Sequence, residues 1–355
     1  MAAATPAATI TAERLRAQLL AGAPARDPLA VTQRLLAVQG QDARGFRLAI
    51  RARSSGLRAA DVDAALSDGA LLVTWLNRGT LHLVCSEDYA WLHSLTAPRL
   101  LTGNARRLQQ EGVTPDAADR AVRTIQRALS ADGPLTRPQL KQRIDAAGVR
   151  TEGQALVHLL MLATLRGVAV RGPMIGSEHA YAPVATWLKT QRRFTRERAL
   201  AELARRYMQG HAPADARDLA RWSGLALGDA RAGLAAIASE LRERPDGLLE
   251  PARRRRAPAQ QAPPRLLGAF DPLLLGWCSR EPIVGRNESL VTVNGLFRPF
   301  ALARGRAVAR WTIAAREVEL EPFERLTRAD AAALREDADD VLRYLAIAPA
   351  SARRS

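Results

Sequence analysis

Two glutamines close together carry the most specific chemistry in the sequence. Gln39 and Gln41 flank Gly40 and are followed by Asp42. A glutamine amide does not titrate near neutrality, but its carbonyl oxygen can orient a water molecule and its dipole can stabilise a positive charge. Side chains two residues apart diverge by about 200° on a helix, whereas they project to one side in an extended or turning segment. We therefore expect Gly40 to end a helix and let the two amides converge.

These polar residues also have simpler interpretations. Gln39 and Gln41 could merely cap the end of a helix and its loop. Asp42 could be an electrostatic partner of a reacting cation, or it could be solvated or paired with an arginine. Both interpretations stay open at this point.

The positions of the lysines, histidines and cysteines exclude or disfavour several kinds of functional site. Neither of the two lysines, Lys141 and Lys189, follows a glycine, so the G-x-x-x-x-G-K-[ST] loop of an ordinary P-loop ATPase is excluded. None of the 5 histidines has metal-ligand spacing, and we expect no metal ion and no cofactor. Cys85 and Cys278 each lie in an apolar run without CxxC spacing, which is typical of buried, reduced thiols in a cytosolic protein.

The chain is strongly basic. Its 355 residues include 52 Lys+Arg against 36 Asp+Glu, a net charge of +16. This charge favours a polyanionic partner, with nucleic acid as the leading candidate. The preference for arginine over lysine has a second explanation, since a GC-rich genome would produce it without any functional reason.

The elements that must position Gln39 and Gln41 are helices followed by a hairpin. The expected helices cover Ala12–Ala21 with Thr11 as its cap, Pro28 to about Gln39, Arg44–Arg53 and Ala59–Leu66. Two β-like runs, Leu71–Leu76 and Thr80–Val84, surround the turn at Arg78-Gly79. This order is typical of a winged helix-turn-helix whose wing is the hairpin, with Ser86–Leu95 as its closing segment.

A similar order recurs twice, after a polar linker around Gln109–Pro115. Residues 109–187 carry three expected helices, the third capped by Thr151, and then a strand pair. Residues 188–264 carry three more helices and a less distinct wing whose loop is expected at Pro251–Pro264. That loop contains the basic run Arg253–Arg256, either a phosphate-binding run or a mobile charged loop.

The last part of the chain changes character. The expected strands are Glu288–Val293, Leu296–Ala303, Arg306–Ile313 and Glu317–Leu320, and a helix capped by Thr327 follows. We therefore predict a mainly α fold with small β elements (α+β). Three tandem winged helix-turn-helix motifs would occupy residues 1–108, 109–187 and 188–264, and a β-barrel-like domain with a terminal helix residues 265–355.

Four ordered segments together resemble the AlkZ/YcaQ-like winged-helix DNA glycosylases, over nearly the whole chain. They are residues 36–42, 75–84, 270–277 and 305–311. The family's architecture agrees with the fold predicted above. Its catalytic signature is Gln-x-Gln in the AlkZ-like branch, which includes azinomycin-resistance enzymes, and Gln-x-Asp in the YcaQ-like branch. The resemblance thus implies catalytic roles for Gln39 and Gln41, with Gly40 in place of a larger apolar residue.

The resemblance also implies a substrate and a reaction. We expect a monofunctional DNA glycosylase that hydrolyses the N-glycosidic bond of bulky N7-alkylated purines, for DNA repair and self-resistance to a genotoxic natural product. Unhooking of crosslinks would extend the same reaction. Its partner would be double-stranded DNA carrying alkylated purines. We expect a cytoplasmic, nucleoid-associated monomer without a signal peptide or membrane span.

Candidate DNA contacts lie on the hairpins. Thr80 and His82 alternate on one face of their strand, opposite Leu81 and Leu83. A strand histidine more commonly bonds within its own protein, and arginines at strand ends can simply be solvated. The complete candidate set is Arg78, Thr80, His82, Arg298, Arg304, Arg306 and Arg310.

A non-catalytic winged-helix DNA-binding protein is the main alternative, either a transcription regulator or a factor that shields lesions. An RNA-binding scaffold comes third, because no aromatic RNP-type or KH-type motif is present. Charge and repeats do not separate these classes. The Gln39-Gly40-Gln41 motif favours the enzyme, since a regulator has no reason to carry it at the end of a helix.

Overall fold

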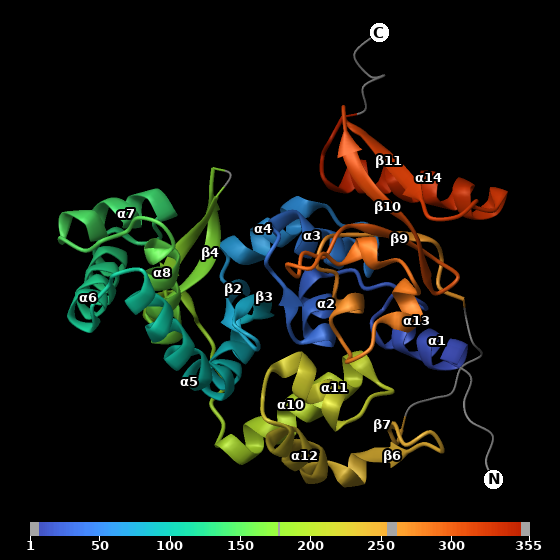
Figure 1. The fold of residues 1–355 in the computed structure, drawn as a ribbon, viewed down its shortest axis with the longest axis horizontal. Coiled ribbons are helices and arrows are strands. Elements are labelled where there is room, and N and C mark those ends of the chain that lie inside the picture. Colours follow the sequence, from blue (N-terminus) through green and yellow to red (C-terminus); the bar gives the residue numbers. More distant parts are fainter. Residues whose placement is uncertain (1–6, 177, 254–260, 349–355) are drawn as a thin grey trace. The chain divides into compact units, whose positions relative to one another are not determined.

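The computed structural model describes residues 7–176, 178–253 and 261–348 (Figure 1). The fold is mixed, with many helices and antiparallel sheets, in agreement with the predicted α+β class. The chain forms two compact units. The first unit comprises Met1–Val62, Leu200–Trp222 and Ala226–Ser355, and the second comprises Asp63–Ala199 and Ser223–Leu225.

The N-terminal elements of the first unit are α1 (Ala7–Ala17), α2 (Pro28–Leu35), β1 (Val38–Gln39) and α3 (Ala43–Ala52). The predicted cap at Thr11 is wrong, because Thr11 lies inside α1 and its hydroxyl donates to the carbonyl of Ala7. The predicted start of α2 at Pro28 is confirmed, and Asp27 caps the helix. That helix ends four residues earlier than expected, at Leu35, since Leu36 has a left-handed φ of 66°.

The middle segment contains α10 (Arg196–His211), α11 (Ala216–Ser223) and α12 (Leu227–Ala236), then η1 (Ala238–Glu240). A short hairpin follows, in which β6 (Leu241–Glu243) pairs with β7 (Leu249–Pro251). Its turn precedes the loop that the sequence predicted at Pro251–Pro264. Arg253 is exposed, and the rest of the Arg253–Arg256 run lies outside the described residues.

The C-terminal sheet has four antiparallel strands in the order β11-β10-β9-β8. They are β8 (Arg265–Leu267), β9 (Phe300–Ala303), β10 (Arg306–Ala314) and β11 (Glu317–Pro322). Within the described ranges, β8 and β11 remain edges, so the expected barrel-like closure does not form. The predicted strand Glu288–Val293 is also wrong: η3 (Glu288–Leu290) is a 3₁₀ turn, and one bridge joins Val291 to Phe297.

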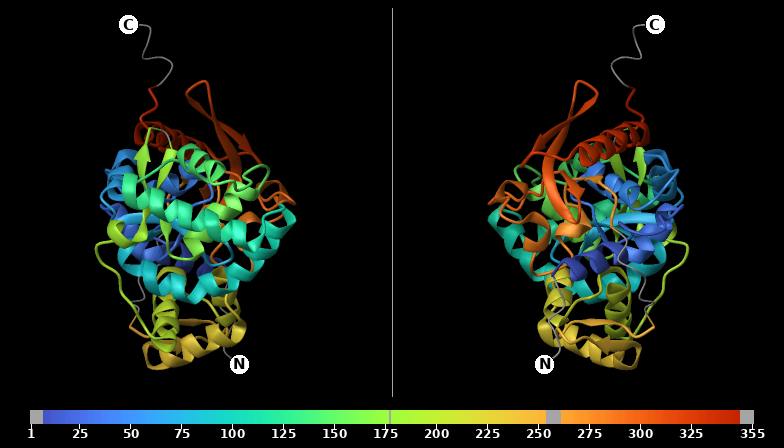
Figure 2. Two further views of the ribbon diagram at one scale, coloured as in Figure 1. Left: turned by 90° about the vertical axis from the view of Figure 1, so that its left-hand side faces the viewer. Right: turned by 90° about the vertical axis from the view of Figure 1, so that its right-hand side faces the viewer.

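The helix α14 (Arg328–Tyr344), capped by Thr327 as predicted, lies along this sheet (Figure 2). Together with α3 it encloses a core. Leu48 comes from α3, Leu266 and Trp311 from the strands, and Leu334 and Val341 from α14. Two short elements, η2 (Pro272–Leu274) and α13 (Glu281–Val284), connect β8 to η3.

In the second unit, two hairpins join into one sheet in which β3, β2, β4 and β5 adjoin in that order. The strands are β2 (Leu71–Leu76), β3 (Thr80–Cys85), β4 (Ala169–Ile175) and β5 (Glu178–Pro183). The helices are α5 (Ser86–Gln110), α6 (Pro115–Asp132), α7 (Arg137–Ala146), α8 (Ala155–Leu165) and α9 (Val184–Trp187). The helix α4 (Ala59–Ser67) crosses the boundary between the two units.

Two local predictions fail in the second unit. The helix α5 is longer than the expected closing segment Ser86–Leu95 and ends at Gln110, whereas the loop between α5 and α6 lies within the predicted linker. Thr151 does not cap α8: its hydroxyl donates to Asp145 at 2.5 Å, and the residue at the start of α8 is Gln154.

Candidate active site

The two glutamines lie on the short connection between α2 and α3. Gln39 is in the extended segment β1 and the residue is 6% exposed, whereas Gln41 is exposed. The prediction that Gly40 ends the helix was wrong, because α2 ends at Leu35 and Leu36 follows with a left-handed φ. The backbone is extended over Val38–Gln39, and Gln41 lies in a bend after Gly40.

Asp42 has a structural role in this connection. It is the N-cap of α3, and its carboxylate accepts a hydrogen bond from the backbone N–H of Gly45. A carboxylate at this position also interacts favourably with the positive end of the helix dipole. The cap fixes the end of the connection immediately after Gln41.

The first turn of α3 packs against the backbone of a second segment. A Cβ atom placed on Gly45 would lie 2.3 Å from the carbonyl oxygen of Ala269, and one on Gly268 would lie 3.0 Å from the Cα atom of Gly45. Only glycine allows such an approach. The segment at residues 268–269 therefore fixes the first turn of α3, which directly follows the Gln39–Asp42 connection.

A buried ion pair ties the other end of α3 to the same segment. Arg53 and Asp271 are both fully buried, and their atoms Nη2 and Oδ1 are 2.8 Å apart. Gln18 accepts a second hydrogen bond from Arg53. The carboxylate of Asp271 also accepts from the N–H of Leu273 and so caps η2. Removing one partner from such a pair leaves a buried charge uncompensated, which costs about 3–5 kcal/mol.

Aromatic packing holds the remainder of the 270–277 segment. The Tyr207 hydroxyl donates to the carbonyl of Gly276, and the Trp277 indole N–H donates to the carbonyl of His211. The rings of Tyr207 and His211 stack with their centroids 4.6 Å apart. Burial lowers the pKa of His211 to about 3, so its imidazole is neutral at physiological pH. This segment therefore has a packing role.

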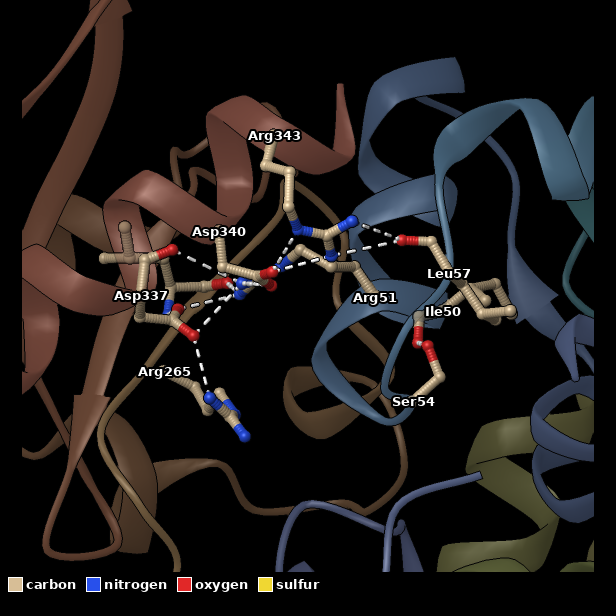
Figure 3. Close-up of polar contacts among 9 residues, drawn as sticks. Ile50, Arg51, Ser54, Leu57, Arg265, Asp337, Asp340 and Arg343 are labelled. Atoms are coloured by element: carbon tan, nitrogen blue, oxygen red, sulfur yellow. Dashed lines mark hydrogen bonds and ion pairs between the residues drawn. The ribbon is translucent and has the colours of Figure 1, made fainter. Parts of the chain in front are cut away.

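Figure 3 shows how α3 is joined to α14. Arg51 forms hydrogen bonds with Asp337 and Asp340 of α14 and with the carbonyl of Leu266. Arg265 shares the carboxylate of Asp337. Arg51 in the last turn of α3 and Arg53 at its C-cap thus fix the helix through buried ion pairs.

The second unit carries the predicted hairpin contacts at Arg78, Thr80 and His82. His82 is 3% exposed and its Nδ1 lies 3.0 Å from the carbonyl oxygen of Thr80. Burial, and then the neighbouring charge of Arg78, lower the pKa of His82 to about 3. Its imidazole is therefore neutral, and the structure does not present it as a solvent-facing contact. Arg78 and Thr80 are half-buried.

The four predicted arginines of the C-terminal sheet differ in their surroundings. Arg304 pairs with Asp330 at 3.2 Å, and Arg310 pairs with Glu321 on the neighbouring strand. Arg298 and Arg306 are exposed. Sequence reasoning missed two further arginines, Arg286 and Arg325, which line one hollow together with Arg304 and Arg306. They are isolated in the sequence, so no local pattern singled them out.

The described part of the chain contains no group of three or more His, Cys, Asp or Glu side chains that could hold a metal ion. Over the same residues, every helix is too short or too polar to cross a membrane.

Comparison with known proteins decides the family. The family model described as DNA glycosylase AlkZ-like matches residues 32–344, which is most of the chain. The chain belongs to the AlkZ-like DNA glycosylase family. It is therefore a DNA glycosylase, and the alternative of a non-catalytic regulator is set aside.

Two relatives agree with this assignment. A Streptomyces sahachiroi protein named interstrand DNA cross-link repair glycosylase is 27% identical over 337 residues, which cover 88% of this chain and 89% of that protein. The solved structure of Streptomyces sahachiroi DNA glycosylase AlkZ matches with a TM-score of 0.80 and 23% identity over 98% of both chains. This second likeness concerns the fold.

Proposed function

We propose that this AlkZ-like enzyme is a monofunctional glycosylase for bulky N7-alkylated purines, including purines in interstrand crosslinks. The name of the Streptomyces sahachiroi relative supports the crosslink part of the proposal. The enzyme would act as a monomer on the double-stranded DNA of the nucleoid in the cytoplasm. Its helix and hairpin order supports three winged-helix motifs within residues 1–264.

The reaction does not require a strong general acid from the protein. Alkylation at N7 leaves the purine cationic, so the C1′–N9 bond breaks with its electron pair moving onto a base that becomes neutral. The oxygen of water then bonds to C1′, and its proton passes to solvent. The enzyme needs to orient the water and to stabilise positive charge on the sugar, and amide carbonyls can do both.

The placement of Gln39 and Gln41 is the observation that carries the proposal. Their connection is only a few residues long and is fixed at one end by α2 and at the other by the Asp42 cap of α3. Gly45 and the Arg53–Asp271 pair hold α3 against the 268–271 segment. A connection fixed in this way keeps its amides preorganised, which is the condition for electrostatic stabilisation of a transition state.

Alanine substitution tests the assignment. Gln39→Ala and Gln41→Ala should each reduce single-turnover excision by about 10²–10³, the range for losing one preorganised polar group. Affinity for duplex DNA should barely change, and the two losses should be less than additive because the amides act as a unit. The assay measures abasic sites in DNA carrying methylated, azinomycin-type or other bulky adducts. Parental rates in both variants on a confirmed substrate would place the active site elsewhere.

A further inference from the structure

A hollow of about 630 Å³ lies within the first unit, beside the C-terminal sheet. Three segments form it: α13 with the residues that follow, the β9–β10 turn, and the connection from β11 to α14. Four arginines line it, namely Arg286, Arg304, Arg306 and Arg325. Of the carboxylates that the structure describes, those of Glu281 and Glu324 line the same hollow.

The arginines in this hollow outnumber the described carboxylates that line it. Elsewhere in the first unit, Arg51, Arg53 and Arg244 each have carboxylate partners at ion-pair distance. In the hollow, Arg304 has such a partner in Asp330, and its own side chain is 54% exposed. Among the side chains that the structure describes, Arg286, Arg306 and Arg325 form no ion pair. Cations gathered in one concavity repel one another, so a bound anion would relieve that repulsion.

We propose that this hollow binds a backbone phosphate of the DNA substrate, apart from the catalytic glutamines. The guanidinium group presents planar, paired donors that match the oxygens of a phosphate. Arginines from three segments can bind one or two phosphates from several sides. The proposal rests on the chain being a DNA glycosylase, and on no part of the glutamine mechanism.

The exposure of the arginines favours a strand of DNA over a small phosphate compound. Sites for small molecules bury most of their ligand's surface. Here Arg286, Arg306 and Arg325 are all exposed. A second hollow, of about 500 Å³, lies against α1 and shares Arg304 and Arg306, so the β9–β10 turn is accessible from two sides. An extended backbone can follow such a turn, whereas a small ligand would not be enclosed.

The test compares two variants with the same net charge. The hollow variant carries Arg286→Gln, Arg306→Gln and Arg325→Gln. The control variant carries Arg231→Gln, Arg328→Gln and Arg335→Gln, three exposed arginines of the first unit that do not line the hollow. Affinity for an undamaged duplex is measured by fluorescence anisotropy between 50 and 400 mM KCl, and melting curves verify that both variants are folded.

Loss of one or two phosphate contacts should reduce the slope of log K against log [KCl] by about 1–2 and the affinity at 0.1 M by about 10–100-fold. The control variant should change the slope by less than half as much. Equal changes in both variants would overturn the proposal, since they would reflect net charge alone. If the hollow variant has a clearly lower melting temperature than the parent, the single variants Arg306→Gln and Arg325→Gln are used instead. Their salt slopes are then compared with those of the parent and the control variant.

Two further measurements separate the sources of phosphate and the two proposals. Calorimetry with inorganic phosphate compares the parent and the hollow variant. If phosphate binds the parent but not the hollow variant, while the slope of log K for DNA against log [KCl] is the same in both, the hollow is a site for a free phosphate compound. That result would overturn the DNA assignment. Affinity for the duplex should stay near the parental value in Gln39→Ala and Gln41→Ala, whereas it should fall in the hollow variant. Loss of excision in the glutamine variants does not affect the slope comparison, so either proposal can fail alone.

Discussion

At the scale of single residues, the two glutamines differ in a way that their shared motif conceals. Gln39 is nearly buried in an extended segment, whereas Gln41 is exposed immediately before the Asp42 cap. A buried amide is oriented by its protein surroundings, while an exposed one is available to water and substrate. We therefore infer that a change at Gln41 tests chemistry with little effect on folding.

Gln41→Asp is the sharpest such change. It converts the motif into the Gln-x-Asp of the sister branch and places a negative charge where a cation develops on the sugar. We expect excision by Gln41→Asp to stay within about tenfold of the parental rate, in contrast to the loss of about 10²–10³ in Gln41→Ala. Single-turnover assays on one lesion compare the three proteins. Equal loss in both variants would argue against a water-orienting or cation-stabilising role.

The buried histidine of the second unit gives a prediction about pH. The pKa of His82 is lowered to about 3, first by burial and then by Arg78, against about 6.5 in an unfolded chain. Between these values the unfolded state binds a proton that the folded state does not. The neutral imidazole's contribution to stability is therefore complete above about pH 6.5 and declines as the pH falls toward 3, by about 1.4 kcal/mol per unit.

Urea unfolding at pH 7, 6 and 5 checks this sign. The parent should lose more stability between pH 6 and 5 than His82→Leu does, by about 1.4 kcal/mol. Histidine NMR signals provide an independent reading, because the His82 ring should stay neutral throughout. A ring that titrates near pH 6.5 would contradict the burial and restore His82 as a cationic DNA contact.

At the scale of elements, the decisive contact is between α3 and the 268–271 segment. Gly45→Ala would bring a Cβ atom against the carbonyl oxygen of Ala269, so α3 or that segment must shift. We expect slower excision together with a lower melting temperature, because the shift moves the connection that carries Gln39 and Gln41. A displacement of this kind by about 1 Å can cost 10²-fold in rate.

Gly103→Ala is the matched control for this prediction. Gly103 also lies inside a helix, α5, but a Cβ atom there would meet nothing within 4 Å. Alanine should stabilise that helix by about 0.5–1 kcal/mol and leave excision unchanged. Thermal melting and single-turnover excision are measured for both variants. A Gly45→Ala protein that behaves like Gly103→Ala would show that the close approach does not position the glutamines.

Local sequence signals predicted most helices and strands but not how these elements pack against one another. Local signals are Pro28 at the start of α2, the Leu71–Leu76 run and the cap at Thr327, which act through their immediate neighbours, and each was found where predicted. The end of α2 was missed because its left-handed residue is Leu36, and leucine gives no turn signal. The expected strands Glu288–Val293 and Leu296–Ala303 were predicted to be neighbours, but among the described residues they are joined by one bridge, Val291 to Phe297, because strand pairing depends on tertiary partners.

The candidate site also has a part that the sequence predicted and a part that it did not. The Gln39-Gly40-Gln41 motif could be found from the sequence because its residues are adjacent. The partners that fix it, Arg53 with Asp271 and Gly45 with Ala269, are more than two hundred residues apart, so only the fold brings them together. The hollow of four arginines was missed for this reason also.

At the scale of the whole molecule, the scarcity of lysine limits the chemistry. Cleavage of the strand after base removal requires an amine that forms a Schiff base with the sugar, and lysine is its usual source. Lys141 and Lys189 both belong to the second unit, whereas both glutamines belong to the first. The Nζ atom of Lys141 forms an ion pair with the carboxylate of Asp145, at 2.6 Å.

We therefore expect excision to release the free base and to leave an abasic site in an unbroken strand. Borohydride added during excision should trap no covalent adduct between enzyme and DNA, and the nicked strand should appear only after treatment with alkali. A known lyase on the same substrate is the positive control for trapping. An adduct with the parent that disappears in Lys141→Gln or Lys189→Gln would identify a lysine nucleophile and contradict the monofunctional assignment. An adduct that survives both substitutions would point to the N-terminal amine, the remaining aliphatic amine of the chain, and would contradict that assignment equally.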